Sequence, residues 1–192
     1  MCTNHCTDHQ QPQDKKALLF AADQLNDAHA QFNLALLYED ENNPELAKKY
    51  YHRAADEHDH AGAHNNLGFM YAHEGNSELA LRYLHNAADK HNLAHAQLNL
   101  GLFYDADKNI EQAKHYLHCA ADTNNFPQAQ FILASVYEQQ NDIENAKKYF
   151  HRAADEHRLY EAFINLSALY KQENNSEKAE HYLRLAQESD AE

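Results

Sequence analysis

The chain has few of the residues that interrupt helices or build catalytic loops. Its 192 residues include 4 Gly, 3 Pro and no Trp. Because glycine-rich loops are the usual cradles for phosphates, four scattered glycines exclude such a loop. No serine stands in the sharp, glycine-flanked turn that exposes a hydrolase nucleophile. These absences predict a largely helical protein that is not an enzyme and needs no cofactor.

Cysteine and long apolar runs are also scarce. Cys2 and Cys6 lie in a polar start and Cys119 stands alone, which is no disulfide framework. The opening letters MCTNHCTDHQQPQDKK lack the apolar stretch of a signal peptide, and no run is long enough to span a membrane. We therefore expect a protein of a reducing compartment, located in the cytoplasm.

Positive charge is scarce relative to negative charge. The chain has 16 Lys and Arg against 30 Asp and Glu, a net charge of −14 with His neutral. Such a field repels nucleic acid and anionic membranes, and it attracts basic partners. If all 16 His became protonated at acidic pH, their positive charge would offset this net negative charge.

What the chain does have is a motif that recurs every 33 residues. The letters HRAADEH occur at 52–58 and again at 151–157, with HNAADKH and HCAADTN at the intervening positions. Three columns recur at i, i+4 and i+8, which is one stripe of a helix. They begin at Ala30, Leu34 and Tyr38. A second stripe follows in each repeat, beginning at Ala47, Tyr50 and Ala54. Each repeat is therefore predicted to be two amphipathic helices.

The turn between the two helices carries a residue that can cap the second helix. The predicted N-caps are Asn43, Asn76, Asn109, Asp142 and Asn175. A Glu follows two positions later each time, where the helix dipole favours an anion. We expect repeats at about 28–60, 61–93, 94–126, 127–159 and 160–192, preceded by one half-repeat helix. The remaining start, 1–12, is expected to be a disordered tail, and 13–192 a single domain.

These repeats resemble the tetratricopeptide repeats and their Sel-like relatives. The segments NNLGFMY and LNLGLFY match the Leu-Gly-x-x-Tyr core of the tetratricopeptide pattern, and RAADE resembles the Sel-like branch. The period of 33 rather than 34 and the missing closing Pro depart from that pattern. The resemblance implies an all-α fold, a right-handed α-solenoid of helix-turn-helix repeats. It also implies that the first helices form a concave groove that binds peptides. The lysines with which chaperone-binding members hold a terminal carboxylate are absent, which disfavours acidic tails as ligands.

The predicted groove combines an Asn column, apolar columns and acids. Its residues are Asn33, Asn66, Asn99, Asn165, Phe32, Leu36, Phe69, Leu98, Leu102, Phe131, Asp105 and Glu138. An Asn amide can donate to and accept from the backbone of an extended peptide. Alternatively, these Asn bond only within the scaffold, and the sequence leaves both alternatives open.

The histidines allow two interpretations. His52, His85, His118 and His151 each precede an Asp by four residues. They form either solvated i,i+4 pairs on the second helices or a set of sites that grips an acidic surface when protonated. Two further clusters, HDHAGAH and HNLAH, show no matching carboxylate pattern, so only adventitious metal binding is expected there.

The main functional prediction is a non-catalytic scaffold that binds a peptide or helix of a partner protein rich in basic and apolar residues. The alternative is a protein that binds zinc, nickel or copper. Its candidate ligands are the His clusters and the spacing of Cys2, His5, Cys6 and His9, which would share a helix face. The sequence leaves the oligomeric state undetermined.

Overall fold

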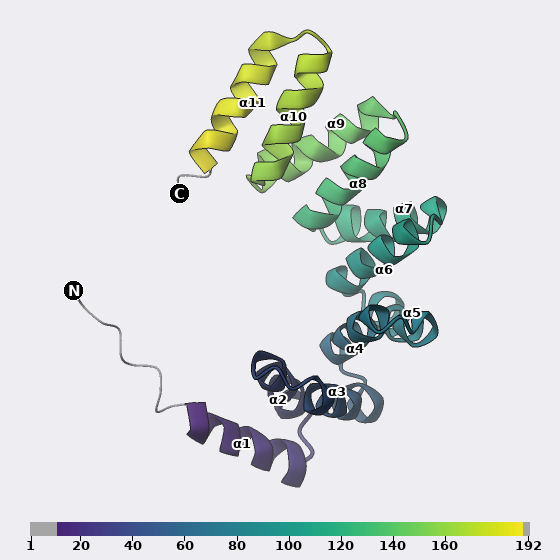
Figure 1. The fold of residues 1–192 in the computed structure, drawn as a ribbon, viewed down its shortest axis with the longest axis vertical. Coiled ribbons are helices and arrows are strands. Elements are labelled where there is room, and N and C mark those ends of the chain that lie inside the picture. Colours follow the sequence, from purple (N-terminus) through teal and green to yellow (C-terminus); the bar gives the residue numbers. More distant parts are fainter. Residues whose placement is uncertain (1–10, 190–192) are drawn as a thin grey trace, which may run out of the picture. The chain divides into compact units, whose positions relative to one another are not determined.

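Helices and the turns between them make up residues 11–189, the part of the chain that the computed structural model describes (Figure 1). The α-helices are α1 (Gln11–Gln24), α2 (Ala28–Asp40), α3 (Pro44–His52), α4 (Ala61–His73), α5 (Ser77–His85), α6 (Ala94–Ala106), α7 (Ile110–His118), α8 (Pro127–Gln139), α9 (Ile143–His151), α10 (Tyr160–Gln172) and α11 (Ser176–Ser189). Five helix pairs follow α1, so the predicted all-α fold of helix-turn-helix repeats is confirmed. α1 includes Gln11 and Pro12, which the sequence assigned to the tail.

Two compact units divide the chain, Met1–Ala96 and Gln97–Glu192. The core of the first unit contains Leu34, Tyr51 and Leu67, all without exposed surface. The core of the second unit contains Leu133, Phe150 and Leu166, which are equally buried. Leu34, Leu67, Leu133 and Leu166 belong to one repeated column of the first helices. Tyr51 and Phe150 occupy one repeated position of the second helices. Whether 13–192 acts as one domain stays a prediction.

The turn inside each repeat follows the predicted capping chemistry. The side chain of Asn43 accepts a hydrogen bond from the backbone N of Leu46 at 3.2 Å, and the other predicted caps accept at the same place. The residue before each cap has a positive φ; Gly75 has φ 75°, whereas Lys108 adopts φ 62° without the freedom of glycine. Within residues 11–189, no helix has the length and apolarity that a membrane span requires.

The turn between repeats, which we call the corner, has a geometry that the sequence did not indicate. Each of the first four second helices ends in a π-helical turn, at Arg53–Glu57, Asn86–Lys90, Cys119–Thr123 and Arg152–Glu156. A residue with positive φ follows two positions later, at Asp59, Asn92, Asn125 and Arg158. The chain then returns a backbone bond across the corner, such as His60 N to Ala54 O at 3.0 Å. The HRAADEH motif therefore marks the wide turn that leads into the next repeat.

The two helices of a repeat approach each other at a column of small residues, which we call the small-residue column: Ala35, Gly68, Gly101, Ala134 and Ser167. At two of these positions the close contact depends on glycine. A Cβ added at Gly68 would lie 2.6 Å from Leu84 Cγ, and one added at Gly101 would lie 2.6 Å from Leu117 Cγ. Real Cβ atoms do not approach so closely. The same column holds Ala134, where Phe150 rather than Leu stands opposite. Gly therefore stands across from the buried Leu84 and Leu117, whereas Ser167 stands across from the more exposed Leu183.

Candidate peptide-binding surface

One apolar column of the first helices remains open to solvent. Leu36 on α2 is 37% exposed, Phe69 on α4 is 51% exposed, and Leu102 on α6 is 41% exposed. Two positions earlier on the same helices, Leu34, Leu67 and Leu100 have no exposed surface. These helices therefore place a large apolar side chain at one repeated surface position, as the groove prediction requires.

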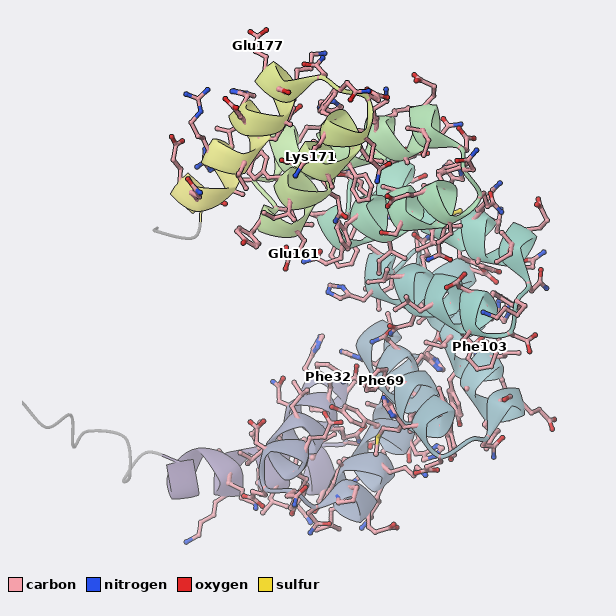
Figure 2. The ribbon with its side chains drawn as sticks, turned by 45° about the horizontal axis from the view of Figure 1, so that its top comes forward. Phe32, Phe69, Phe103, Glu161, Lys171 and Glu177 are labelled. Atoms are coloured by element: carbon pink, nitrogen blue, oxygen red, sulfur yellow. The ribbon has the colours of Figure 1, made fainter. Side chains whose placement is uncertain are left out.

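A second apolar column forms the packed base beside it. Phe32 is half-buried and its ring stacks on His60 with 4.6 Å between centroids. In the other unit, the ring of Phe131 lies 5.5 Å from Phe150, and Leu98 packs against the core. Figure 2 labels Phe32 and Phe69, which come from the neighbouring first helices α2 and α4. This column is thus anchored in the scaffold and offers only part of its surface.

The predicted Asn column divides between the two alternatives. Asn66 Nδ2 donates to the hydroxyl of the buried Tyr51 at 2.8 Å, and its Oδ1 accepts from Asn65 at 3.0 Å. Asn165 Nδ2 donates to the backbone O of Glu161 in its own helix at 2.9 Å. The amides of Asn66 and Asn165 therefore bond within the protein, which favours a scaffold role for these two.

The remaining two members of the Asn column lie on α2 and α6. Asn33 is exposed and Asn99 is half-buried. Asn33 is the one exposed member of the predicted column, and it lies three residues before Leu36 on the same helix. Its role in binding stays a prediction.

The acids beside the apolar columns keep their charge available. Asp105 on α6 and Glu138 on α8 are half-buried, and Glu161 on α10 is exposed (Figure 2). None of the three forms an ion pair with another residue of the described part of the chain. Two lysines of the second helices instead pair with acids in the turn of the next repeat, Lys48 with Glu74 at 2.6 Å and Lys147 with Glu173 at 2.8 Å. These three acids, which we call the rim, are therefore not neutralised by cationic side chains of the described residues.

The His column is more deeply involved in the scaffold than the sequence suggested. The predicted i,i+4 pairs are present, with Nδ1 to carboxylate distances of 2.8–3.0 Å. However, Nε2 of His52 lies 2.9 Å from the hydroxyl of Tyr71 in the next repeat, and His118 and His151 make the same contact with Tyr137 and Tyr170. The predicted pairs are therefore confirmed, but His52, His118 and His151 make a second contact that the sequence did not predict. They join one repeat to the next.

The carboxylates of this column accept several hydrogen bonds at once. Asp122 accepts from His118 at 2.9 Å, from Tyr149 at 3.0 Å and from Arg152. Partial burial opposes ionisation of Asp122, but these bonds outweigh it and lower the pKa of the carboxyl group. Burial and the neighbouring Asp56 raise the pKa of Tyr83 to about 12. The phenols thus remain neutral donors and the carboxylates remain charged acceptors.

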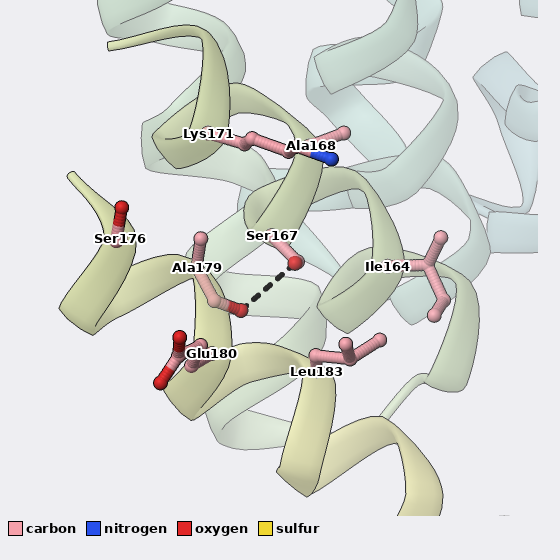
Figure 3. A pocket seen from close by; sticks show the side chains of 8 residues that line it. All are labelled: Ile164, Ser167, Ala168, Lys171, Ser176, Ala179, Glu180 and Leu183. Carbon is pink, nitrogen blue, oxygen red and sulfur yellow. Dashed lines mark hydrogen bonds between the residues drawn. The ribbon is translucent and has the colours of Figure 1, made fainter. Parts of the chain in front are cut away.

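A pocket of about 470 Å³ lies between α10 and α11, which run side by side (Figures 1 and 3). Ser167 Oγ donates to the backbone O of Ala179 across it at 2.8 Å. Leu183 lines the pocket and is 44% exposed, whereas the equivalent residues Tyr51, Leu84 and Phe150 are buried under the next helix. The pocket therefore marks the side of the last helix pair on which a further helix would pack.

The candidate thiol and tail ligands offer little chemistry in the described structure. Cys2, His5, Cys6 and His9 lie outside the described residues. Cys119 is half-buried and forms no disulfide within the described residues.

If the turn after α1 at Asn26 is counted as the first corner, the corner after α3 is the second, at Asp59, and the corner after α7 is the fourth, at Asn125. A cluster of side chains in the second corner was not predicted from the sequence. His64 Nε2 lies 3.1 Å and His91 Nε2 3.2 Å from Oδ1 of Asp59. The expectation that no carboxylate matches the His clusters is therefore wrong. The signal was obscured because Asp59 and His64 lie 27 or more residues from His91, and only the repeat geometry brings them together.

Family models match most of the described chain. The Sel1 repeat model matches residues 28–59, 61–92 and 94–125, which together make up half of the chain. The tetratricopeptide repeat model matches residues 127–155 and 160–192. Both families were named by the resemblance of the sequence motifs, and the division falls between the third and fourth repeats.

Solved structures share this fold at low sequence identity. One is described as the functional characterization of Pseudomonas aeruginosa pilF, with 23% identity, 93% of this chain and 85% of that chain covered, and a TM-score of 0.74. BtubC from P. vanneervenii has 19% identity, covers 96% and 92%, and has a TM-score of 0.72. YrrB, described as a tetratricopeptide protein with an unusual peptide-binding site, has 21% identity, covers 91% and 93%, and has a TM-score of 0.63. None of the curated proteins matches the chain.

Proposed function

Because this chain belongs to the Sel1 and tetratricopeptide repeat proteins, we propose that it is a non-catalytic scaffold that binds a peptide or helix of a partner protein on its first helices. The observation that carries the proposal is the exposed column of Leu36, Phe69 and Leu102. Large apolar side chains at a repeated surface position are typical of a surface that buries them against a partner.

The charge of the surface defines the partner. Asp105, Glu138 and Glu161 form no ion pair with a Lys, Arg or His side chain among the described residues, and the chain carries a net charge of −14. On the second unit, a ligand with Lys or Arg beside an apolar anchor would bury Leu102 and neutralise Asp105 and Glu138 together. Nucleic acid and anionic membranes would be repelled by the same field. On the cysteine pattern, we propose a cytoplasmic location.

The likeness to YrrB supports a peptide as the ligand class only as an analogy, because the identity is 21%. Asn66 is a weaker candidate for direct contact than Asn33, because its amide already bonds to Tyr51 and Asn65. A change at Asn66 would disturb the scaffold as well as the surface. The apolar column is therefore the better place to test the proposal.

The test uses two sets of synthetic peptides whose binding is measured by fluorescence anisotropy. One set alternates Lys or Arg with Leu or Phe, and the other replaces each base with Glu. The basic set should bind and the acidic set should not. Phe69→Ala should weaken the binding of the basic set about tenfold, the loss typical of truncating an apolar anchor.

Phe20→Ala is the matched control, because Phe20 is 59% exposed on α1 but stands in the column of Arg53 and Arg152 rather than in that of Leu36 and Phe69. Binding by this variant should equal that of the native chain. Asp105→Lys combined with Glu138→Lys should mainly slow association, and the effect should shrink at high salt. Equal binding of both peptide sets, or equal losses from Phe69→Ala and Phe20→Ala, would show that this surface is not the binding site.

A further inference from the structure

Three chemically reactive side chains meet in the corner between the first and second repeats. Asp59 lies just after the first π-helical turn, His64 lies in the first turn of α4, and His91 follows the second π-helical turn. Their ligand atoms all lie within 4.8 Å of one another, and the two imidazole rings are near-parallel with 6.2 Å between centroids. Among the residues whose side chains the structure describes, this is the one group of three or more His, Cys, Asp or Glu with such convergence.

The other corners show what these positions hold in the absence of such a cluster. At the first corner Gln31 Nε2 donates to Asn26 Oδ1 at 2.6 Å, and at the fourth corner Gln130 Nε2 donates to Asn125 Oδ1 at 2.6 Å. In the third repeat, Gln97 and Asn124 occupy the positions of His64 and His91, and they bond at 2.9 Å. The position of His91 is His58 at the first corner and His157 at the fourth, so a histidine there is not particular to the second corner. The positions of Asp59 and His64 hold neutral amides at the other three of these corners, and the second corner replaces both with metal-ligating side chains.

A third change accompanies these two. Arg53 and Arg152 donate to the first and fourth corners, at Asn26 and Asn125 respectively. At the second corner the equivalent residue is Asn86, so no guanidinium occupies the space beside Asp59. Lys90 instead contacts Asp59 from the outside, through Oδ2, and its side chain is 61% exposed. Oδ1 of Asp59 is left to the two imidazoles.

We propose that Asp59, His64 and His91 form a binding site for one divalent transition-metal ion of the zinc class. Zinc binds imidazole nitrogen and carboxylate oxygen at about 2.0–2.2 Å, so two ligand atoms of a tetrahedral shell lie about 3.3–3.5 Å apart. The distances from Asp59 Oδ1 to the two Nε2 atoms, 3.1 and 3.2 Å, are already close to that separation. Two imidazoles and one carboxylate leave the fourth position to water or to a ligand.

The protonation states of the corner suit a metal ion. His64 is 4% exposed, and burial is the main cause that lowers its pKa, so the neutral form that coordinates a metal is favoured. The Lys90 ammonium, followed by the imidazole of His91, holds the pKa of Asp59 far below its usual value. The carboxylate is thus charged and its second oxygen is held by Lys90, which orients the first.

One feature limits the affinity. Nδ1 of His64 is buried and has no hydrogen-bond partner within the described structure, whereas metal-bound histidines usually donate from the second nitrogen. The loss of such support costs about 10–100-fold in metal affinity. We therefore expect binding weaker than that of a structural zinc site with a complete outer shell.

The test is zinc titration of the full chain carrying Cys2→Ser and Cys6→Ser, which removes the thiols of the tail. One equivalent of zinc should bind in competition with a chromophoric chelator. His64→Gln and Asp59→Asn should each weaken that binding at least about tenfold, because each removes one of three ligands. Both variants install the residue that equivalent corners hold, so the fold should persist in circular dichroism.

His181→Gln is the control, since it removes an exposed histidine of α11 and should leave zinc binding unchanged. Cobalt provides a second measurement: visible bands of a four-coordinate ion without a thiolate charge-transfer band should appear in the native corner and disappear in His64→Gln. Equal zinc affinity in His64→Gln, Asp59→Asn and His181→Gln, or a thiolate band from Cys119, would overturn the proposal. Scattered histidines or the free thiol would then hold the metal.

Discussion

The second repeat, 61–93, and the fourth, 127–159, have the same backbone but different chemistry at their corners. Both begin after a π-helical turn and a residue with positive φ, Asp59 with φ 56° and Asn125 with φ 48°. The imidazoles of two histidines lie beside the side chain of Asp59, whereas the side chain of Asn125 accepts hydrogen bonds from an amide and a guanidinium. The backbone of the corner is therefore set by the carbonyls of the doubled Ala and by the turn. Its side chains are free to take on another function.

If the two repeats share one packing scheme, equal changes in their cores should have equal effects. Leu67→Ala and Leu133→Ala each remove a side chain that has no exposed surface. Each should lower the free energy of unfolding by about 2–5 kcal/mol, from lost burial and the cavity left behind. Urea unfolding followed by circular dichroism measures both. If the losses of unfolding free energy in the two variants differed by more than the range of about 2–5 kcal/mol for buried Leu allows, the two repeats would be packed differently.

The small-residue column should distinguish the two repeats. Gly68→Ala would place a methyl group 2.6 Å from Leu84 Cγ and 3.1 Å from its backbone N. Overpacking of about 1–3 kcal/mol should exceed the gain of about 1 kcal/mol from helix propensity, so the variant should be less stable. Adding Leu84→Phe should restore part of the loss by recreating the Ala134–Phe150 pair. A Gly68→Ala variant that melts higher than the native chain would contradict the close contact.

The charged contacts of the fourth repeat should respond to pH. Asp122 has a folded-state pKa below that of the unfolded chain, so its stabilisation is present above about pH 4 and is lost as the pH falls through the folded value. Asp122→Asn should cost about 1–2 kcal/mol at pH 7, a value limited by its exposure, and less at pH 3. Asp155→Asn is the matched control, because His151 is the one side chain of the described residues that hydrogen-bonds to Asp155. Unfolding curves at both pH values test the difference; an Asp122→Asn cost that stays constant between them would contradict it.

The smallest effect should come from converting one corner into the other. Asp59→Asn together with His64→Gln gives the second corner the side chains of Asn125 and Gln130. Without metal the free energy of unfolding should change by less than about 1 kcal/mol, since an exposed Lys90–Asp59 pair contributes little. Measurement in chelator isolates this comparison. A loss of several kcal/mol would show that the second corner needs its own side chains to fold.

The helices and their caps could be predicted because the same signals recur in five copies. Asn43 and its equivalents differ little in residue type, and the burial of Leu34 follows from a stripe that repeats. The corners could not be predicted in the same way. Their positive-φ position holds Asn, Asp and Arg, and the preceding Ala-Ala-Asp favours an ordinary helix, so no local propensity indicates a wide turn.

The site could be predicted only in part. The exposed position of Leu36, Phe69 and Leu102 follows from helix periodicity, whereas the bond of Asn66 to Tyr51 depends on how two helices pack. The contact of His52 with Tyr71 and the convergence of His64 with His91 each require the stacking of one repeat on the next. A sequence column gives the spacing of such residues along the chain but not the direction in which each side chain points.

The hydrogen bonds that join repeats have a consequence for how the protein folds. The contact of Tyr149 with His118 and the bond from Arg152 to the backbone of Ala121, for example, connect residues 31 positions apart. Contacts of such short range along the chain close only small loops, which lowers the entropic barrier and speeds folding. Any adjacent pair of repeats can then serve as a starting point from which order spreads in both directions. During synthesis, the amino-terminal repeats could reach their native contacts while the carboxyl-terminal ones are still being made.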